Sequence, residues 1–326
     1  MRLIHSLLAI SAAAVLVYAG PGAAQDLGFP KRPIHLIVPF APGAGVDVAA
    51  RLIGAEMAGP LGQPITIDNR PGAAGQIGVQ AMLAAPADGY TLVANSNGAL
   101  STAPHLRGVP YDFLTDLLPV GIMYTSDYVI AVNRDYPAQN LKELIDASRT
   151  APQALNFGVS GIASHHHLAV ELIKMMSGAR FNVIAYGTWP KAVLAASTGE
   201  LPAAIADTQS VQPFLKEGKV RILAVTGARR QRVLPDVPTV AQAGLSGYAV
   251  DGGVAIFVAA RTPQSIVDRL RSGLERALAM PAIQDKLRAA NMEPGTPMTQ
   301  DQLRALVKSE YDTWGRVVKA ANIQPQ

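Results

Sequence analysis

Short β-rich runs alternate with helical patterns along most of this chain, and this alternation is the strongest constraint on its fold. The run Ile34 to Pro39 (IHLIVP) is typical of a short buried strand, and the residues that follow have helical spacing. Further strands are predicted at 65–67, 91–94, 129–132, 155–159, 183–186 and 221–226, and further helices at 77–85, 141–148, 165–177 and 191–198. Thr299 and Gln302 have the spacing of a capping box that opens a last helix. The pattern predicts an α/β fold with helices layered on mainly parallel sheets.

The first residues have the pattern of an export signal. A weakly basic start precedes an apolar stretch at 7–19, and residues 22–24 (GAA) supply the small residues of a cleavage site. We predict a signal peptide at 1–24, cut after Ala24, and therefore an exported mature protein. The apolar stretch is shorter than the roughly 20 residues that span a bilayer, which disfavours the alternative of a retained membrane anchor. No cysteine follows it, which excludes a lipid-anchored form.

The composition excludes several classes of function. The chain has no cysteine, so disulfides, thiolate nucleophiles, Cys-ligated zinc and iron–sulfur clusters are absent. The formal net charge is +4, a mild excess that favours an anionic ligand. Because the Lys and Arg residues are dispersed and form no dense stripe, we expect no nucleic-acid partner.

The length of the mature chain, roughly 300 residues, suggests two domains. No internal repeat and no low-complexity linker is present. We therefore expect the chain to cross between two lobes on ordered strands, an arrangement that permits hinge closure around a ligand.

A strand, a glycine-rich loop and a helix follow one another twice. IHLIVPF is followed by APGAG and a helix that begins near Val46, and ALNFGV is followed by SGIAS and a helix that begins near His165. Each loop precedes a helix N-terminus, whose free N–H groups bind anions. Two such sites that face each other would suit the two carboxylates of one ligand. The alternative interpretation is that both are ordinary turns between a strand and a helix.

Three motif-based alternatives fail. The loop lacks the third glycine of a dinucleotide-binding fingerprint, because position 48 is valine. The chain has no Gly-Lys-Ser/Thr phosphate-binding loop and no Gly-x-Ser-x-Gly nucleophile motif. No carboxylate or histidine pair has the spacing of a general acid–base pair, so we expect no enzyme activity.

The role of several histidines and aspartates stays open between ligand contact and a structural function. His165, His166 and His167 are adjacent, and since successive helical side chains point about 100° apart, they cannot converge on one metal ion. Contact with ligand, with pH-dependent charge, and packing remain open for them. Asp47 is expected to organise its own loop, and Asp207 either selects a polar ligand group or caps a loop.

The chain resembles the substrate-binding proteins of tripartite tricarboxylate transporters, the TctC or Bug-type family. The segments that carry the resemblance are KRPIHLIVPFAPGAGVD (31–47), IDNRPGAAGQIG (67–78), ADGYTL (87–92), GKVRILAVTGARR (218–230) and LPDVPTVAQAGL (234–245). The resemblance implies a type II periplasmic-binding-protein fold with two α/β lobes and a ligand cleft between them. We expect residues 25–125 with 251–326 to form one lobe, and 126–250 the other.

The resemblance also implies capture of a small organic acid in the periplasm, delivery to membrane permease subunits, and no catalysis. We expect no cofactor or metal, and a monomer, which is the ordinary state of a hinged binding protein. Carried over position by position, it places these residues at the ligand: Phe40, Ala41, Gly43, Ala44, Gly45, Asp47, Ser96, Asn97, Ser160, Gly161, Ser164, His165, His166, Tyr186, Thr188 and Asp207. The alternative function is an exported ligand sensor that signals to a membrane protein.

The chain departs from the family pattern around the predicted ligand. Ala44 interrupts the three glycines that are common in the first loop, and imidazoles stand at 165 and 166 where small residues are usual. Gly187 and Thr188 replace a lysine-glycine pair. The identity of the acid therefore does not follow from the family.

Overall fold

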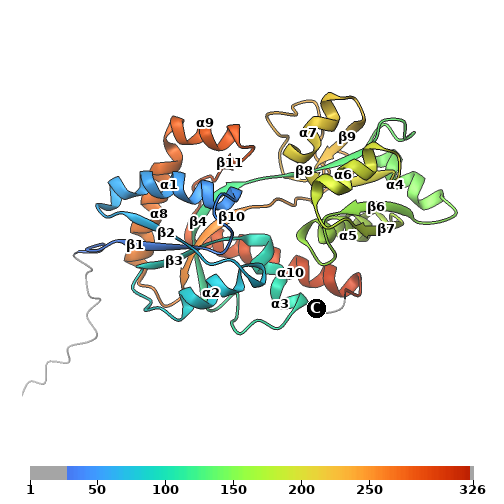
Figure 1. Ribbon diagram of the computed structural model, residues 1–326. Coiled ribbons are helices and arrows are strands. Elements are labelled where there is room, and N and C mark those ends of the chain that lie inside the picture. The colour runs from blue at the N-terminus through green and yellow to red at the C-terminus, as the bar shows by residue number, and fades with distance from the viewer. Residues whose placement is uncertain (1–27, 324–326) are drawn as a thin grey trace, which may run out of the picture.

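The computed structural model of this protein describes residues 28–323, so the predicted signal peptide and its cleavage after Ala24 lie outside the described residues. Two lobes are present, each built on a β-sheet with helices packed against it (Figure 1). None of the described helices is long and apolar enough to cross a membrane.

The first lobe contains a six-stranded sheet with the strand order β11-β4-β10-β3-β1-β2. Its strands are β1 (Ile34–Val38), β2 (Ile65–Asn69), β3 (Thr91–Ser96), β4 (Leu117–Thr125), β10 (Val254–Ala259) and β11 (Glu293–Pro294). Its helices are α1 (Gly45–Leu61), the 3-10 helix η1 (Ala73–Gly75), α2 (Gln76–Leu83), α3 (Asn97–Leu106), α8 (Gln264–Ala279), α9 (Pro281–Ala289) and α10 (Gln300–Ala320). Residues of β10 are buried throughout, as expected for a central strand covered on both faces.

The second lobe contains a five-stranded sheet with the strand order β7-β6-β8-β5-β9. Its strands are β5 (Tyr128–Asn133), β6 (Leu155–Val159), β7 (Phe181–Ala185), β8 (Ala203–Asp207) and β9 (Val220–Val225). Its helices are α4 (Leu141–Thr150), α5 (His165–Ser177), α6 (Trp189–Ser197) and α7 (Thr208–Lys216).

Both sheets are mixed, and the expectation of mainly parallel sheets was wrong. Strand β1 pairs in parallel with β2 and β3, but β10 runs antiparallel to both β3 and β4. In the second lobe β6 is parallel to β7 and β8, whereas β5 is antiparallel to β8 and β9. The reason is that the chain crosses between the lobes at these strands. Strand β5 enters the second lobe from the first, and β10 returns in the opposite direction. Each therefore runs antiparallel to the strands beside it in the sheet that it joins.

Two extended segments connect the lobes. One runs from the end of β4 into β5, and the other leads into β10. They pair with each other through an antiparallel bridge between Asp127 and Asp251, and the Gly252 N–H donates to the Ser126 carbonyl over 2.7 Å. A pair of hydrogen-bonded strands is an ordered connection that can still twist, which suits a hinge.

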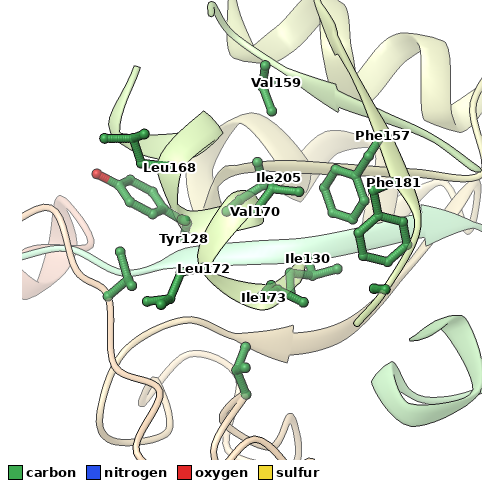
Figure 2. Close-up of a cluster of buried hydrophobic side chains, with 14 of the residues drawn as sticks. Tyr128, Ile130, Phe157, Val159, Leu168, Val170, Leu172, Ile173, Phe181 and Ile205 are labelled. Atoms are coloured by element: carbon green, nitrogen blue, oxygen red, sulfur yellow. The ribbon is translucent and has the colours of Figure 1, made fainter. Parts of the chain in front are cut away.

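The core of the second lobe is a cluster of aliphatic and aromatic side chains from β5, β6, β7, β8 and α5 (Figure 2). The rings of Phe157 and Phe181 pack with centroids 5.0 Å apart. Tyr128 lies at the other end of the cluster, with its hydroxyl directed away from both phenylalanines (Figure 2). This hydroxyl therefore lies at the edge of the core, where β5 begins.

Helix α10 packs on both lobes. Leu303 and Val307 near its start belong to a core cluster of the first lobe, whereas Trp314 and Val317 near its end belong to the core of the second. Figure 1 shows this helix running beneath the lobe junction. The last helix therefore ties the two lobes together on the face opposite α9 and α7.

Candidate functional site

The loop between β1 and α1 is held by one buried carboxylate. Asp47, 2% exposed, accepts hydrogen bonds from the Gly43 N–H over 2.9 Å and from the Asn69 side-chain amide over 2.8 Å. Arg51 donates to the same carboxylate over 3.0 Å, and Asn69 also donates to the Phe40 carbonyl. Asp47 therefore organises its own loop, as the sequence suggested, and fastens that loop to β2.

The pKa of Asp47 is lowered to about 2, first by the hydrogen bond from Arg51 and also by the Gly43 N–H and Asn69, which together outweigh burial. The carboxylate is therefore ionised under all physiological conditions. Its hydrogen-bonding capacity is directed into the loop rather than outward.

The start of α1 is open to a ligand. The residue at the N-cap is Ala44, which has no side chain that could accept a hydrogen bond from the helix. The N–H groups of residues 45–47 consequently have no intrahelical acceptor and no side-chain cap, and the first intrahelical bond is donated by Val48 to the Ala44 carbonyl. Gly43 has a φ of +83° and no atom within 4 Å of the place of a β-carbon, so the backbone here is accessible. A carboxylate fits such a group of donors.

The starts of α3 and α5 are capped by their own side chains. Ser96 accepts from the Ala99 N–H over 3.4 Å, and Ser164 accepts from the His167 N–H over 3.2 Å. Ser164 also donates to the Gly161 carbonyl over 2.6 Å. The two starts therefore offer fewer free N–H groups than that of α1.

His166 is fixed in one tautomer. The indole of Trp189 donates to His166 Nδ1 over 3.2 Å, and the Ser160 hydroxyl lies 3.1 Å from the same nitrogen. Because an indole N–H only donates, Nδ1 is unprotonated, and the neutral imidazole carries its hydrogen on Nε2. This Nε2 is buried and has no partner among residues 28–323, and the same holds for Asn97 Oδ1. The site thus holds one donor and one acceptor with unused capacity.

His165 joins the two lobes. Its Nδ1 lies 3.1 Å from the Tyr128 hydroxyl, and its ring packs edge-on against Trp314 with centroids 4.7 Å apart. A β-carbon on Gly98, in the first turn of α3, would lie 2.7 Å from this ring. The absence of a side chain at 98 therefore lets the start of α5 contact the start of α3.

Burial keeps both imidazoles neutral. It lowers the pKa of His165 to about 4 and that of His166 to about 3, and the neighbouring His165 adds to the effect on His166. The hypothesis that these residues add pH-dependent charge to the site therefore finds no support in their surroundings. The His167 side chain instead accepts a hydrogen bond from the Ala163 N–H. In the described part of the chain, no group of three side chains is arranged to hold a metal ion.

We expect the imidazole resonances of His165 and His166 to stay constant between about pH 5.5 and 8, because the titration of both rings is displaced to acid pH. Two-dimensional NMR of the imidazole nitrogens measures this. Titration of either residue near neutral pH would contradict the buried, neutral assignment.

Three other residues that were predicted to contact the ligand lie in surroundings of their own, outside the contacts of His165 and His166. The Tyr186 hydroxyl donates to Glu200 over 2.6 Å, beyond the far end of α6, so its polar atom is directed away from His166. Thr188 is the exposed N-cap of α6 and makes no capping hydrogen bond. Asp207 caps α7 by accepting from the Ser210 N–H over 2.7 Å, which is the capping role considered from the sequence.

The structure thus brings most of the predicted loops into one chain of contacts. Asn69 connects the first loop to β2. A β-carbon on Gly75 would lie 2.5 Å from Asn95, the neighbour of Ser96. Gly98 contacts the ring of His165. Sequence reasoning missed the positioning roles of Asn69 and Gly98. Asn69 stands in the quoted segment IDNRPGAAGQIG, and its polar side chain at the end of a strand was the available signal.

A cavity of about 690 Å³ lies beside the hinge, apart from the predicted ligand residues. It is lined by the hinge residues 125–127 and 251, by residues 228–233 of the second lobe, and by residues 285, 288 and 291–293 of the first. Met292 of this lining also packs at the place of a β-carbon on Gly45. Since both lobes line the cavity, its size depends on their relative position.

Comparison with known proteins identifies the family. The model of the tripartite tricarboxylate transporter family receptor, TctC, matches residues 49–323. The chain belongs to this family. A UPF0065 protein of Bordetella pertussis is 33% identical to it over 322 residues, which cover 98% of this chain and 99% of the relative.

Solved structures agree with the TctC assignment. A TctC solute-binding protein from Polaromonas, without ligand, has a TM-score of 0.82 at 25% identity and covers 90% of this chain and 100% of its own. Rpa4515 of R. palustris, with adipate, has a TM-score of 0.71 at 32% identity. The match covers 92% of this chain and 100% of Rpa4515. The family and the two-lobed α/β fold expected from the sequence are confirmed, and this is a family of binding proteins rather than enzymes.

Proposed function

We propose that this TctC-family protein is a periplasmic solute-binding protein, which captures a small organic acid and delivers it to the permease of a tripartite tricarboxylate-type transporter. The observation that carries the proposal is the open start of α1, where Ala44 leaves the first-turn N–H groups uncapped beside an accessible Gly43. A ligand carboxylate supplies the acceptors that this loop lacks. Support also comes from the relative Rpa4515, which binds adipate.

Hinge closure is part of this proposal. The structure has a higher TM-score with the ligand-free Polaromonas protein than with the adipate complex, although the sequence is more similar to the latter. An open arrangement of the lobes would produce this ordering. In our proposal the lobes 25–125 with 251–326 and 126–250 rotate about the crossing segments, and a carboxylate is enclosed by the loops that end β1, β3 and β6.

The first experiment is a thermal-shift screen of the mature protein (residues 25–326), unfolded and refolded beforehand to remove any bound ligand. Aliphatic mono-, di- and tricarboxylates and aromatic acids are each compared with their neutral amides. A ligand at 100 times its dissociation constant adds about 2.7 kcal/mol to stability, enough to raise the midpoint by several degrees. A shift with an acid but not with its amide supports carboxylate capture, and no shift with any acid contradicts it.

Delivery to a permease is tested separately. In our proposal the mature chain acts as a monomer that docks on membrane subunits only when ligand is bound. Affinity purification from membranes with and without the acid should recover transporter subunits. Recovery of a sensor protein instead would replace transport by signalling.

Gly43→Val is expected to weaken acid binding at least about tenfold while the fold persists, because a side chain at 43 projects into the open space before α1. The matched control is Gly62→Val at the other end of the same helix, which has a similar φ of +76° and equally free space. Both variants carry backbone strain of about 1–2 kcal/mol. Equal affinities of the two variants, measured by calorimetry, would remove the first loop from the site.

A further inference from the structure

Three exposed aliphatic side chains lie on the loops of the candidate site or in the first helical turns that follow these loops. Val48 is 50% exposed, and Ile77 and Ile162 are each 47% exposed. Each belongs to the segment that follows a different parallel strand: β1, β2 and β6. Isolated apolar side chains are common on protein surfaces, so their shared location is the observation that requires an explanation.

The two side chains of the first lobe come from neighbouring loops. Strands β1 and β2 are parallel and in register, with Val38 opposite Asn69, so the loops that follow them start side by side. Val48 lies in the first turn of α1, and Ile77 in the first turn of α2.

The third side chain belongs to the loop that meets the first lobe. Ile162 precedes α5 by three residues, and the first residue of α5, His165, packs against Gly98. The loop after β6 is therefore the part of the second lobe that lies next to the loops of the first.

Most of the polar side chains of the same loops are already engaged in hydrogen bonds. Ser96, Ser160 and Ser164 each bond within their own loop or its neighbour. Asp47 is saturated by its loop, and the imidazoles are neutral. The segments 39–48, 71–77 and 160–166 contain no lysine or arginine. Apart from His166 Nε2 and Asn97 Oδ1, which have no partner among the described residues, hydroxyl groups on a ligand would find few side-chain partners, whereas exposed aliphatic carbons and free backbone N–H groups remain.

We propose that the acid bound by this protein has an apolar body, an alkyl chain or an unsubstituted ring, and that Val48, Ile77 and Ile162 are the residues that select it over hydroxylated acids. The proposal rests on the carboxylate capture proposed above and names the ligand class. Binding sites of this kind combine a mostly apolar lining with a few directed polar groups. Closure of the lobes would enclose the hydrocarbon part between Val48 and Ile77 on one side and Ile162 on the other.

The test compares acids that differ only in hydroxylation. Adipate and galactarate have six carbons and two carboxylates, but galactarate carries four hydroxyl groups; succinate with tartrate and hexanoate with gluconate form two further pairs. Titration calorimetry of the refolded mature protein is expected to show at least tenfold tighter binding of the apolar member in every pair that binds. Tight binding of the hydroxylated member would overturn this inference while leaving carboxylate capture intact. Absence of binding by every acid would overturn both.

Two variants assign the selectivity to the side chains. Val48→Thr keeps the shape and adds a hydroxyl, and Ile162→Ser removes most of the aliphatic surface. Each is expected to weaken binding of the apolar acid at least about fivefold and to change binding of its hydroxylated partner less. Met175→Ser is the control, because Met175 is 44% exposed near the opposite end of α5.

An unchanged ratio of affinities within each acid pair in both variants would overturn the role assigned to these residues. If the same variants then reduced recovery of membrane subunits, the exposed aliphatic residues would be a docking surface for the permease instead.

Discussion

Replacing Asp47 with alanine is expected to abolish acid binding and to lower the free energy of unfolding by about 3 kcal/mol. The carboxylate accepts from the Gly43 N–H, the Asn69 amide and Arg51, and its removal leaves these part-buried hydrogen bonds unmade. A hydrogen bond to a charged group contributes about 1.5–3 kcal/mol, and water replaces part of this where the donor is exposed. Without these bonds the loop loses the conformation that keeps the start of α1 accessible. Urea unfolding and calorimetry with the acid found in the thermal-shift screen measure the two effects.

The pH dependence of this loss has a defined sign. The pKa of Asp47 is lowered to about 2 from 3.8, so its contribution to stability is complete above about pH 4 and disappears as the pH falls toward 2. The difference in stability between the wild type and Asp47→Asn should therefore shrink on acidification. The control is Asp68→Asn on β2, whose exposed carboxylate pairs with Arg70 over 2.7 Å and should contribute less than about 1 kcal/mol. Normal stability and binding in Asp47→Ala would contradict the proposed role.

The local elements of this fold follow from local sequence patterns. The strands predicted at 34–39, 155–159 and 221–226 begin and end within two residues of β1, β6 and β9, and the helix predicted at 165–177 is α5. The capping box of Thr299 and Gln302 is present at the start of α10. Apolar periodicity and caps act over a few residues, so they are readable without knowledge of the rest of the chain.

Long-range arrangement was not readable in the same way. Strands β4 and β10 are continuous apolar runs without periodicity, which a helix could equally contain, and their antiparallel pairing depends on the crossing between lobes. The packing of Trp314 in the core of the second lobe joins residues far apart in the sequence. No local pattern distinguishes a helix that stays on one lobe from one that connects two.

At the candidate site, too, local features could be predicted from the sequence and long-range contacts could not. The glycine-rich loop before α1 was found from its sequence, but its support by Asn69 depends on the pairing of β1 with β2. The loop before α5 was expected to offer an anion site equal to the first. Its serine cap instead takes up one of the first-turn N–H groups, and the tautomer of His166 depends on Trp189, 23 residues later. The choice of ligand-binding loop thus depends on which N-termini the protein caps itself.

The hinge carries a second strong pH effect, with the opposite sign to that of Asp47. Asp127 and Asp251 face each other across the two crossing segments, beside the 690 Å³ cavity. Burial, and after it the charges of Asp251 and Glu293, raise the pKa of Asp127 to about 7 against the opposing effect of Arg229. The folded protein therefore keeps a proton on Asp127 that the unfolded chain releases above about pH 4.

Stability should consequently fall as the pH rises from about 4 to 7 and remain lower above that. Asp127→Asn removes the titrating group while keeping its shape. At pH 8 the variant is expected to be more stable than the wild type by on the order of 2 to 4 kcal/mol, and at about pH 4 the two should be equal. Thermal unfolding across this range measures the difference, which should reach about 5 °C at pH 8.

The control for the hinge effect is Asp285→Asn, which removes an exposed carboxylate from the lining of the same cavity and should not reproduce the stabilisation at pH 8.

Ligand binding should be linked to the same proton. Closure of the lobes narrows a cavity that both line, which removes water from Asp127 and favours its neutral form further. Binding near pH 7.5 is therefore expected to take up a fraction of a proton, visible as a dependence of the calorimetric enthalpy on the ionisation enthalpy of the buffer. Asp127→Asn should abolish this dependence without changing the contacts at α1. A buffer dependence that persists in Asp127→Asn would place the proton elsewhere and separate the hinge carboxyl from closure.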